Sequence, residues 1–151
     1  MTLKETSATR PDGTLLVIAY LLTLGAGFLL GGLTLLVTAL PQSLQMAQGD
    51  SLFVGGAAVL LFLTIACLLF GGWLLVVARR LWSARPNSRP AAAVTLAVLA
   101  MMALLSIPTF FIAYDGGSFL LASVAGAALL AALSAACYWY LTRPHVKSYF
   151  G

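Results

Sequence analysis

Four long apolar segments, separated by short polar stretches, make up most of the chain. Their hydrophobic residues follow one another almost without interruption, instead of recurring at the period of an amphipathic helix or strand. None of the four segments contains Asp, Glu, Lys, Arg or His. The segments cover residues 14–40, 52–78, 91–114 and 119–142.

Each apolar segment is long enough to cross a bilayer as a helix. A transmembrane helix needs about 20 apolar residues to span a hydrocarbon core about 30 Å thick. Because lipid offers the backbone no hydrogen bonds, a spanning segment of this kind is expected to be helical. We therefore predict an all-α integral membrane domain over residues 1–151, with residues 1–13 and 143–151 as tails outside the membrane.

The first segment also resembles a secretory signal, since basic residues precede it. The apolar part of a cleaved signal is about 7–15 residues long, and the segment 14–40 exceeds that length. We expect it to be retained as a span.

Composition agrees with a membrane protein. The chain is 62% hydrophobic and 8% charged, with a mean hydropathy of +1.03, whereas soluble domains have about 25% charged residues. The net charge of +4 does not indicate nucleic-acid binding, because the basic residues flank the apolar segments. That placement is typical of residues that determine membrane topology.

The charges alternate between the two sides of the membrane. The two predicted outer connections contain no Lys or Arg and hold Asp50 and Asp115. Under the positive-inside rule, both termini and the middle connection are expected in the cytoplasm. We expect the chain to lie in the cell's inner membrane. All 8 basic residues fall on the cytoplasmic side: Lys4, Arg10, Arg79, Arg80, Arg85, Arg89, Arg143 and Lys147.

The connections between the predicted spans are short. They cover residues 41–51, 79–90 and 115–118. Short connections make sequential helices antiparallel neighbours. We expect a four-helix antiparallel bundle.

Small residues recur at helical spacing in two of the predicted spans. Such faces allow helix backbones to approach closely in a membrane. The spacing leaves open whether they form contacts inside the bundle or contacts with a partner subunit. The candidate packing residues are Gly27, Gly31, Ala122, Gly126, Ala132 and Ala136.

The residues that could carry chemistry are few and scattered. The single His145 follows the last span, and Cys67 and Cys137 are not spaced as a redox pair. Asp50 and Asp115 share the outer face and could together bind a cation, although two carboxylates form an incomplete ligand set. We predict no catalytic residues, no cofactor and no metal site.

The inner face is the most suggestive surface for binding. Basic and aromatic residues there are placed to contact anionic headgroups or a partner protein. The alternative, that the basic residues only set topology, stays open. The candidate contact residues are Arg79, Arg80, Trp82, Arg85, Arg89, Arg143, Lys147, Tyr149 and Phe150.

The C-terminal stretch from Tyr138 to Phe150 resembles the ending of small, largely uncharacterised bacterial four-span membrane proteins. In these proteins the last helix runs into a box of the form Arg-Pro-x-Val-Lys-x-x-Phe, matched here from Arg143 to Phe150. The match departs at His145, where an acidic residue is expected, and it implies no known activity. Physically, Pro144 can begin a new helical turn that lies at the interface.

Two classes of function remain, and a membrane enzyme is a third, minority hypothesis. The leading hypothesis is a non-enzymatic membrane protein, either an accessory or scaffold subunit or a homo-oligomer, that acts through helix–helix and inner-leaflet contacts. The alternative is a small transporter or channel for an uncharged or lipid-like substrate, formed by oligomerisation. Its interior would depend on hydroxyl side chains, because the spans offer no charged residue.

Overall fold

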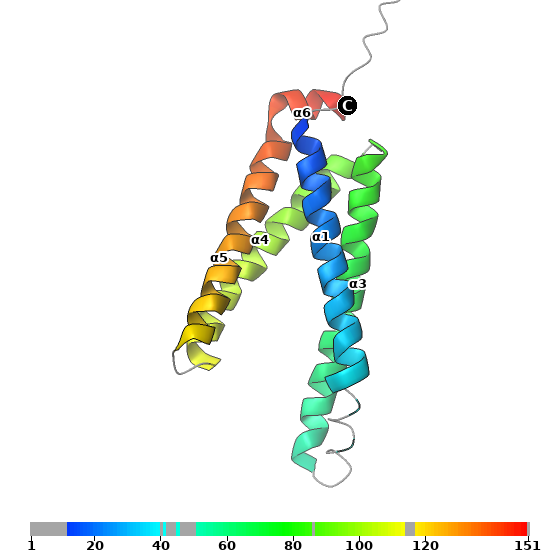
Figure 1. Cartoon of the computed structure of the whole chain (residues 1–151). Helices are drawn as coiled ribbons and strands as arrows, with labels where there is room; N and C mark the ends of the chain where they lie inside the picture. Colours follow the sequence, from blue (N-terminus) through cyan, green and yellow to red (C-terminus); the bar gives the residue numbers. More distant parts are fainter. Residues whose placement is uncertain are drawn as a thin grey trace, which may run out of the picture. The chain divides into compact units, whose positions relative to one another are not determined.

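The structure is a computed structural model that describes residues 12–39, 41, 45, 51–85, 87–113 and 117–150 (Figure 1). Within these residues the regular structure is entirely helical, as predicted. The helices are α1 (Asp12–Thr34), the π-helix η1 (Leu35–Ala39), α3 (Ser51–Trp82), α4 (Ser88–Ala113), α5 (Ser118–Thr142) and α6 (Pro144–Tyr149).

Four of these helical segments are long and apolar enough to cross a membrane. They are Gly13–Ala39, Ala58–Trp82, Ser88–Thr109 and Leu120–Thr142. Each coincides with one of the predicted apolar segments, which supports a multi-pass membrane protein.

Two helix ends at the central connection differ from the predicted ones. α3 continues to Trp82 and α4 begins at Ser88, so Arg79, Arg80 and Arg89 are helical residues. The apolar pattern marks where a helix leaves hydrocarbon, whereas backbone hydrogen bonding decides where the helix ends. With 32 residues, α3 is roughly 48 Å long, well beyond a core about 30 Å thick.

The chain forms two compact units, of which the first is Ile18–Arg79. In this unit α1 and α3 lie side by side (Figure 1). A Cβ atom added at Gly71 would lie 2.9 Å from the Gly25 carbonyl oxygen and 3.0 Å from the Leu29 backbone nitrogen. Glycine is therefore required where the two backbones meet.

A ring contact continues the α1–α3 packing next to these glycines. Phe28 and Phe70 meet edge to face with their ring centroids 5.3 Å apart. Further along α1, a Cβ atom on Gly32 would lie 3.0 Å from the Leu68 side chain and 3.2 Å from Cys67 Cβ. Because residue numbers rise along α1 as they fall along α3, the two helices are antiparallel.

The second unit consists of the described residues before Ile18 and after Arg79, and its main feature is the α4–α5 hairpin (Figure 1). The start of α4 meets the end of α5 through a hydrogen bond from Arg89 to Leu141, so these helices are also antiparallel. Their buried residues are mostly small, which permits close packing. They include Ala92, Thr95, Ala103, Ala127, Ala131 and Ser134.

Candidate functional site

The connection between α3 and α4 is a tight turn. The Ala84 amide donates to the Leu81 carbonyl oxygen over 3.2 Å, and the Arg85 amide donates to the Arg80 carbonyl oxygen over 3.3 Å. This pair of bonds is the Schellman motif that ends many helices. Ala84 takes the left-handed conformation that the motif requires, with φ of 46°.

The candidate arginines of this turn differ in their surroundings. Arg79, Arg80 and Arg85 are exposed, and so is Trp82 at 56%. Arg89 is half-buried in the first turn of α4. Pro90 is tolerated there because the backbone N–H groups of a first turn have no acceptor inside the helix, so the N–H that proline lacks is not missed. Burial thus distinguishes Arg89 from the exposed arginines of the turn.

Arg89 links the two helices of the hairpin. Its Nε–H donates to the Leu141 carbonyl oxygen over 2.6 Å. Leu141 is in the last turn of α5, where the carbonyl oxygens have no N–H donor inside the helix. A positive charge at this end also interacts favourably with the negative end of the α5 helix dipole. Arg89 therefore caps α5 and joins it to α4.

The C-terminal box forms α6, which begins at Pro144 as expected for a proline at the first helical position. Val146 is fully buried, while Lys147 is exposed. Tyr149 and Phe150 are half-buried, and their rings meet edge to face at 5.0 Å. The box is thus a short helix with one apolar side.

Arg143 lies at the junction between α5 and α6. Its guanidinium carbon is 3.9 Å from the centre of the Trp139 ring, which is a cation–π contact. The pair places one positive charge over an aromatic ring at the end of the last span, an arrangement suited to the membrane interface.

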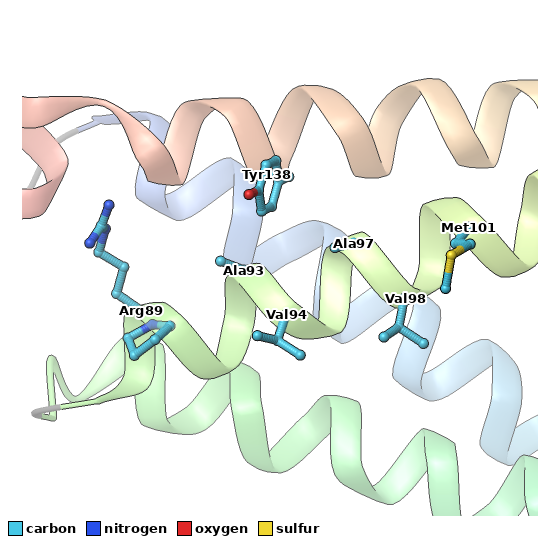
Figure 2. Close-up of a pocket in the computed structure, with 8 residues that line it drawn as sticks. Arg89, Ala93, Val94, Ala97, Val98, Met101 and Tyr138 are labelled. Carbon is cyan, nitrogen blue, oxygen red and sulfur yellow. The ribbon is translucent and has the colours of Figure 1, made fainter.

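A groove of about 430 Å³ runs along α4 beside α5 (Figure 2). Arg89 and Met101 lie at its opposite ends, and Tyr138 reaches it from α5 (Figure 2). Its other lining residues are apolar: Pro90, Ala93, Val94, Ala97 and Val98. No feature of the sequence pattern indicates this groove, because it depends on how α4 and α5 pack.

The candidate packing residues all lie on exposed helix surfaces. Open space surrounds the positions of a Cβ at Gly27, Gly31 and Gly126, and Ala122, Ala132 and Ala136 are exposed. The glycines that pack α1 against α3 are instead Gly25, Gly32 and Gly71. In α5 the buried small residues are Ala127, Ala131 and Ser134. The predicted faces remain available for contacts outside these helix pairs.

Several hydroxyl groups of the candidate spans bond within their own helices. Each of these donates to a carbonyl oxygen three or four residues earlier, which satisfies the donor of the hydroxyl. The bonds run from Thr23 to Ala19, Thr34 to Leu30, Thr64 to Leu60, Thr95 to Ala91 and Ser106 to Ala103.

Two buried hydroxyl groups differ from these. Thr14 Oγ1 and Ser88 Oγ, both in the second unit, have no hydrogen-bond partner among the described residues. An unpaired buried hydroxyl is unfavourable.

Metal-ligating side chains do not gather in the part of the chain that the structure describes: no three His, Cys, Asp or Glu residues cluster there. Cys67 and Cys137 are both free and half-buried. His145 lies in α6, with its ring 6.1 Å from that of Tyr140. Asp50 and Asp115, the candidate cation ligands, lie outside the described residues.

The arrangement as a whole offers surfaces rather than reacting groups: a basic helix end, an apolar groove beside it and open small-residue faces. Comparison with known proteins adds no family to this description, because no protein-family model, no curated protein and no solved structure matches the chain.

Proposed function

We propose that this chain is a non-enzymatic four-span membrane protein that acts as an accessory or scaffold subunit, or as a homo-oligomer. In this proposal the four spans form an antiparallel bundle in the cell's inner membrane, with both termini in the cytoplasm. The protein acts through helix–helix contacts inside the membrane and through its basic inner face.

One observation carries the proposal: small-residue faces on α1 and α5 are open. A Cβ atom added at Gly27, Gly31 or Gly126 would have nothing within 4 Å. In a membrane, a partner helix approaches closely over such residues, because backbone contact replaces the missing side chains. The exposed faces thus match what a helix of a second subunit would need.

The basic inner face supports the same function. Arg80, Arg85 and Lys147 are exposed near the helix ends. Each basic residue near an anionic leaflet contributes about 1 kcal/mol of attraction. These residues would hold the inner end of the protein at the lipid headgroups.

The alternative, a small transporter or channel, has less support. A path for an uncharged substrate would need polar groups that are available to it. The hydroxyls of Thr23, Thr64 and Thr95 donate to their own helices. We therefore place the assembly hypothesis first.

The assembly hypothesis is tested by filling the open faces. Gly27→Leu with Gly31→Leu would block the α1 face, and Ala122→Leu with Gly126→Leu would block the α5 face. Mass measurement by light scattering in a mild detergent, with identification of co-purifying proteins, should show a complex for the wild type. At least one double variant should shift to the single chain.

The matched control is Gly72→Leu, because Gly72 also has open space around it but lies on α3, outside both faces. This variant should keep the wild-type mass. A wild-type chain that purifies alone as a monomer, or double variants that assemble normally, would contradict the proposed function.

A further inference from the structure

The groove along α4 has a charged end and an apolar length. Arg89 lies at one end, and the surface continues over Val94 and Val98 to Met101 (Figure 2). Val94 and Met101 are exposed, at 63% and 58%. This order of chemistry, one cation followed by hydrocarbon, is complementary to a lipid whose headgroup carries a negative charge.

The guanidinium of Arg89 is oriented before any ligand arrives. Its Nε–H donates to the Leu141 carbonyl oxygen over 2.6 Å. The two terminal nitrogens of the guanidinium carry the remaining N–H donors. A phosphate oxygen is the ligand that such a group recognises best.

The groove also has the dimensions of one lipid chain in one leaflet. Met101 lies 12 residues after Arg89, a rise of roughly 18 Å along α4. Half of a hydrocarbon core is about 15 Å thick. A chain with its headgroup at Arg89 would thus reach the middle of the bilayer near Met101.

We propose that this groove binds one anionic phospholipid of the inner leaflet. Its phosphate pairs with Arg89, and one acyl chain lies along Val94, Val98 and Met101. The ring of Tyr138 covers the chain from α5, with its hydroxyl toward the polar end. This site rests on the proposed membrane orientation, since it requires the Arg89 end to lie at the inner leaflet.

A helix of another protein is a poorer occupant of this groove. An apolar helix seated there would remove the Arg89 guanidinium from water and lipid phosphate without a counter-charge, which is unfavourable. A lipid supplies that charge together with the apolar chain.

Native mass spectrometry of the full-length chain in detergent tests the proposal, with phosphatidylglycerol and phosphatidylcholine as probes. The wild type should bind phosphatidylglycerol at least about fivefold more tightly, the ratio expected for one charge contact. Arg89→Gln should remove this preference. Arg89→Lys, which keeps one positive charge at that end of the groove, should retain part of this preference.

A second variant tests the apolar part without touching Arg89. Met101→Trp would fill the groove, whereas Met102→Trp changes a neighbour of nearly equal exposure, 57%, that does not line the groove. Met101→Trp should weaken binding of both lipids about fivefold or more, and Met102→Trp should not. This pair decides the question even where Arg89→Gln fails to fold through loss of the Leu141 bond.

Several outcomes would overturn the lipid site. Equal affinity for the two lipids in the wild type, or equal effects of the two tryptophan variants, would do so. Displacement of phosphatidylglycerol by soluble glycerol phosphate would show that Arg89 binds a free phosphate. A changed oligomeric mass in Met101→Trp, with unchanged lipid binding, would show that the groove binds a protein. A monomer that still binds phosphatidylglycerol selectively would contradict only the proposed assembly.

Discussion

At the scale of single residues, neighbouring glycines in this chain have opposite surroundings. A Cβ on Gly71 would meet the backbone of α1, whereas one on Gly72 would meet nothing within 4 Å. The same holds for Gly32, which faces Leu68, and Gly31, which is open. Each of these two Gly-Gly pairs therefore combines one packing position with one position free for other contacts.

Replacing Gly71 by alanine should destabilise the α1–α3 pair. The added methyl would lie 2.9 Å from the Gly25 carbonyl oxygen, and only a shift of one whole helix could relieve the clash. Overpacking of this kind costs about 1–3 kcal/mol. Reversible unfolding in mixed micelles measures the loss.

Gly72→Ala provides the control, with a change within about 0.5 kcal/mol. If the two alanine variants unfold alike, the close approach of the helices at Gly71 would be refuted.

At the scale of elements, the turn between α3 and α4 contains a conformation that its sequence does not favour. Ala84 has φ of 46° and Asn87 has φ of 66°. The left-handed region costs an alanine about 1–2 kcal/mol, whereas asparagine visits it more readily. The Schellman bonds of Ala84 and Arg85 hold the turn in place despite this cost.

Ala84→Gly should stabilise the protein by about 0.5–1 kcal/mol. Glycine removes the steric cost of the left-handed conformation, and its greater freedom in the unfolded chain offsets part of the gain. The midpoint of thermal unfolding in detergent should rise. Asn87→Gly should change stability less, and a larger effect there than at Ala84 would count against the assigned turn.

The helix α6 should depend on its single buried side chain. Val146→Ala removes the equivalent of two methylene groups from a fully buried position, a loss of about 1–2 kcal/mol. In this variant the rate of chymotrypsin cleavage after Tyr149 should rise about 5–30-fold if α6 opens before it is cut. Mass spectrometry of the intact chain measures that rate. Lys147→Ala alters an exposed residue and should leave the rate unchanged.

At the scale of the whole molecule, the distribution of charge predicts the orientation. If all four candidate spans cross the membrane, we predict that both ends of the chain lie on the same side. The 8 basic residues predict that this side is the cytoplasm.

Reporter fusions test this orientation. A fluorescent protein fused after Gly151 should fluoresce, because it folds in the cytoplasm. Alkaline phosphatase fused after Asp115 should be active outside, and the same enzyme fused after Arg85 should be inactive. Activity of a phosphatase placed at the C-terminus would reverse the proposed topology.

The helical spans could be predicted from sequence because each depends on a local property, an uninterrupted apolar run. The packing residues could not. Gly27 and Gly31 have the spacing of a contact face, yet Gly25 and Gly71 make the contact, since the rotation of each helix is set by its neighbour. The groove beside Arg89 escaped prediction for the same reason, because Tyr138 joins it from another helix.

The bond between Arg89 and Leu141 has a consequence for how the protein is made. The two residues are 52 positions apart, so the donor is synthesised well before its acceptor exists. Chains are synthesised at about 5–20 residues per second, which leaves the arginine without this acceptor for several seconds of translation. A nascent chain that stops before the last span would never acquire the bond, so its α4 would lack this link to α5.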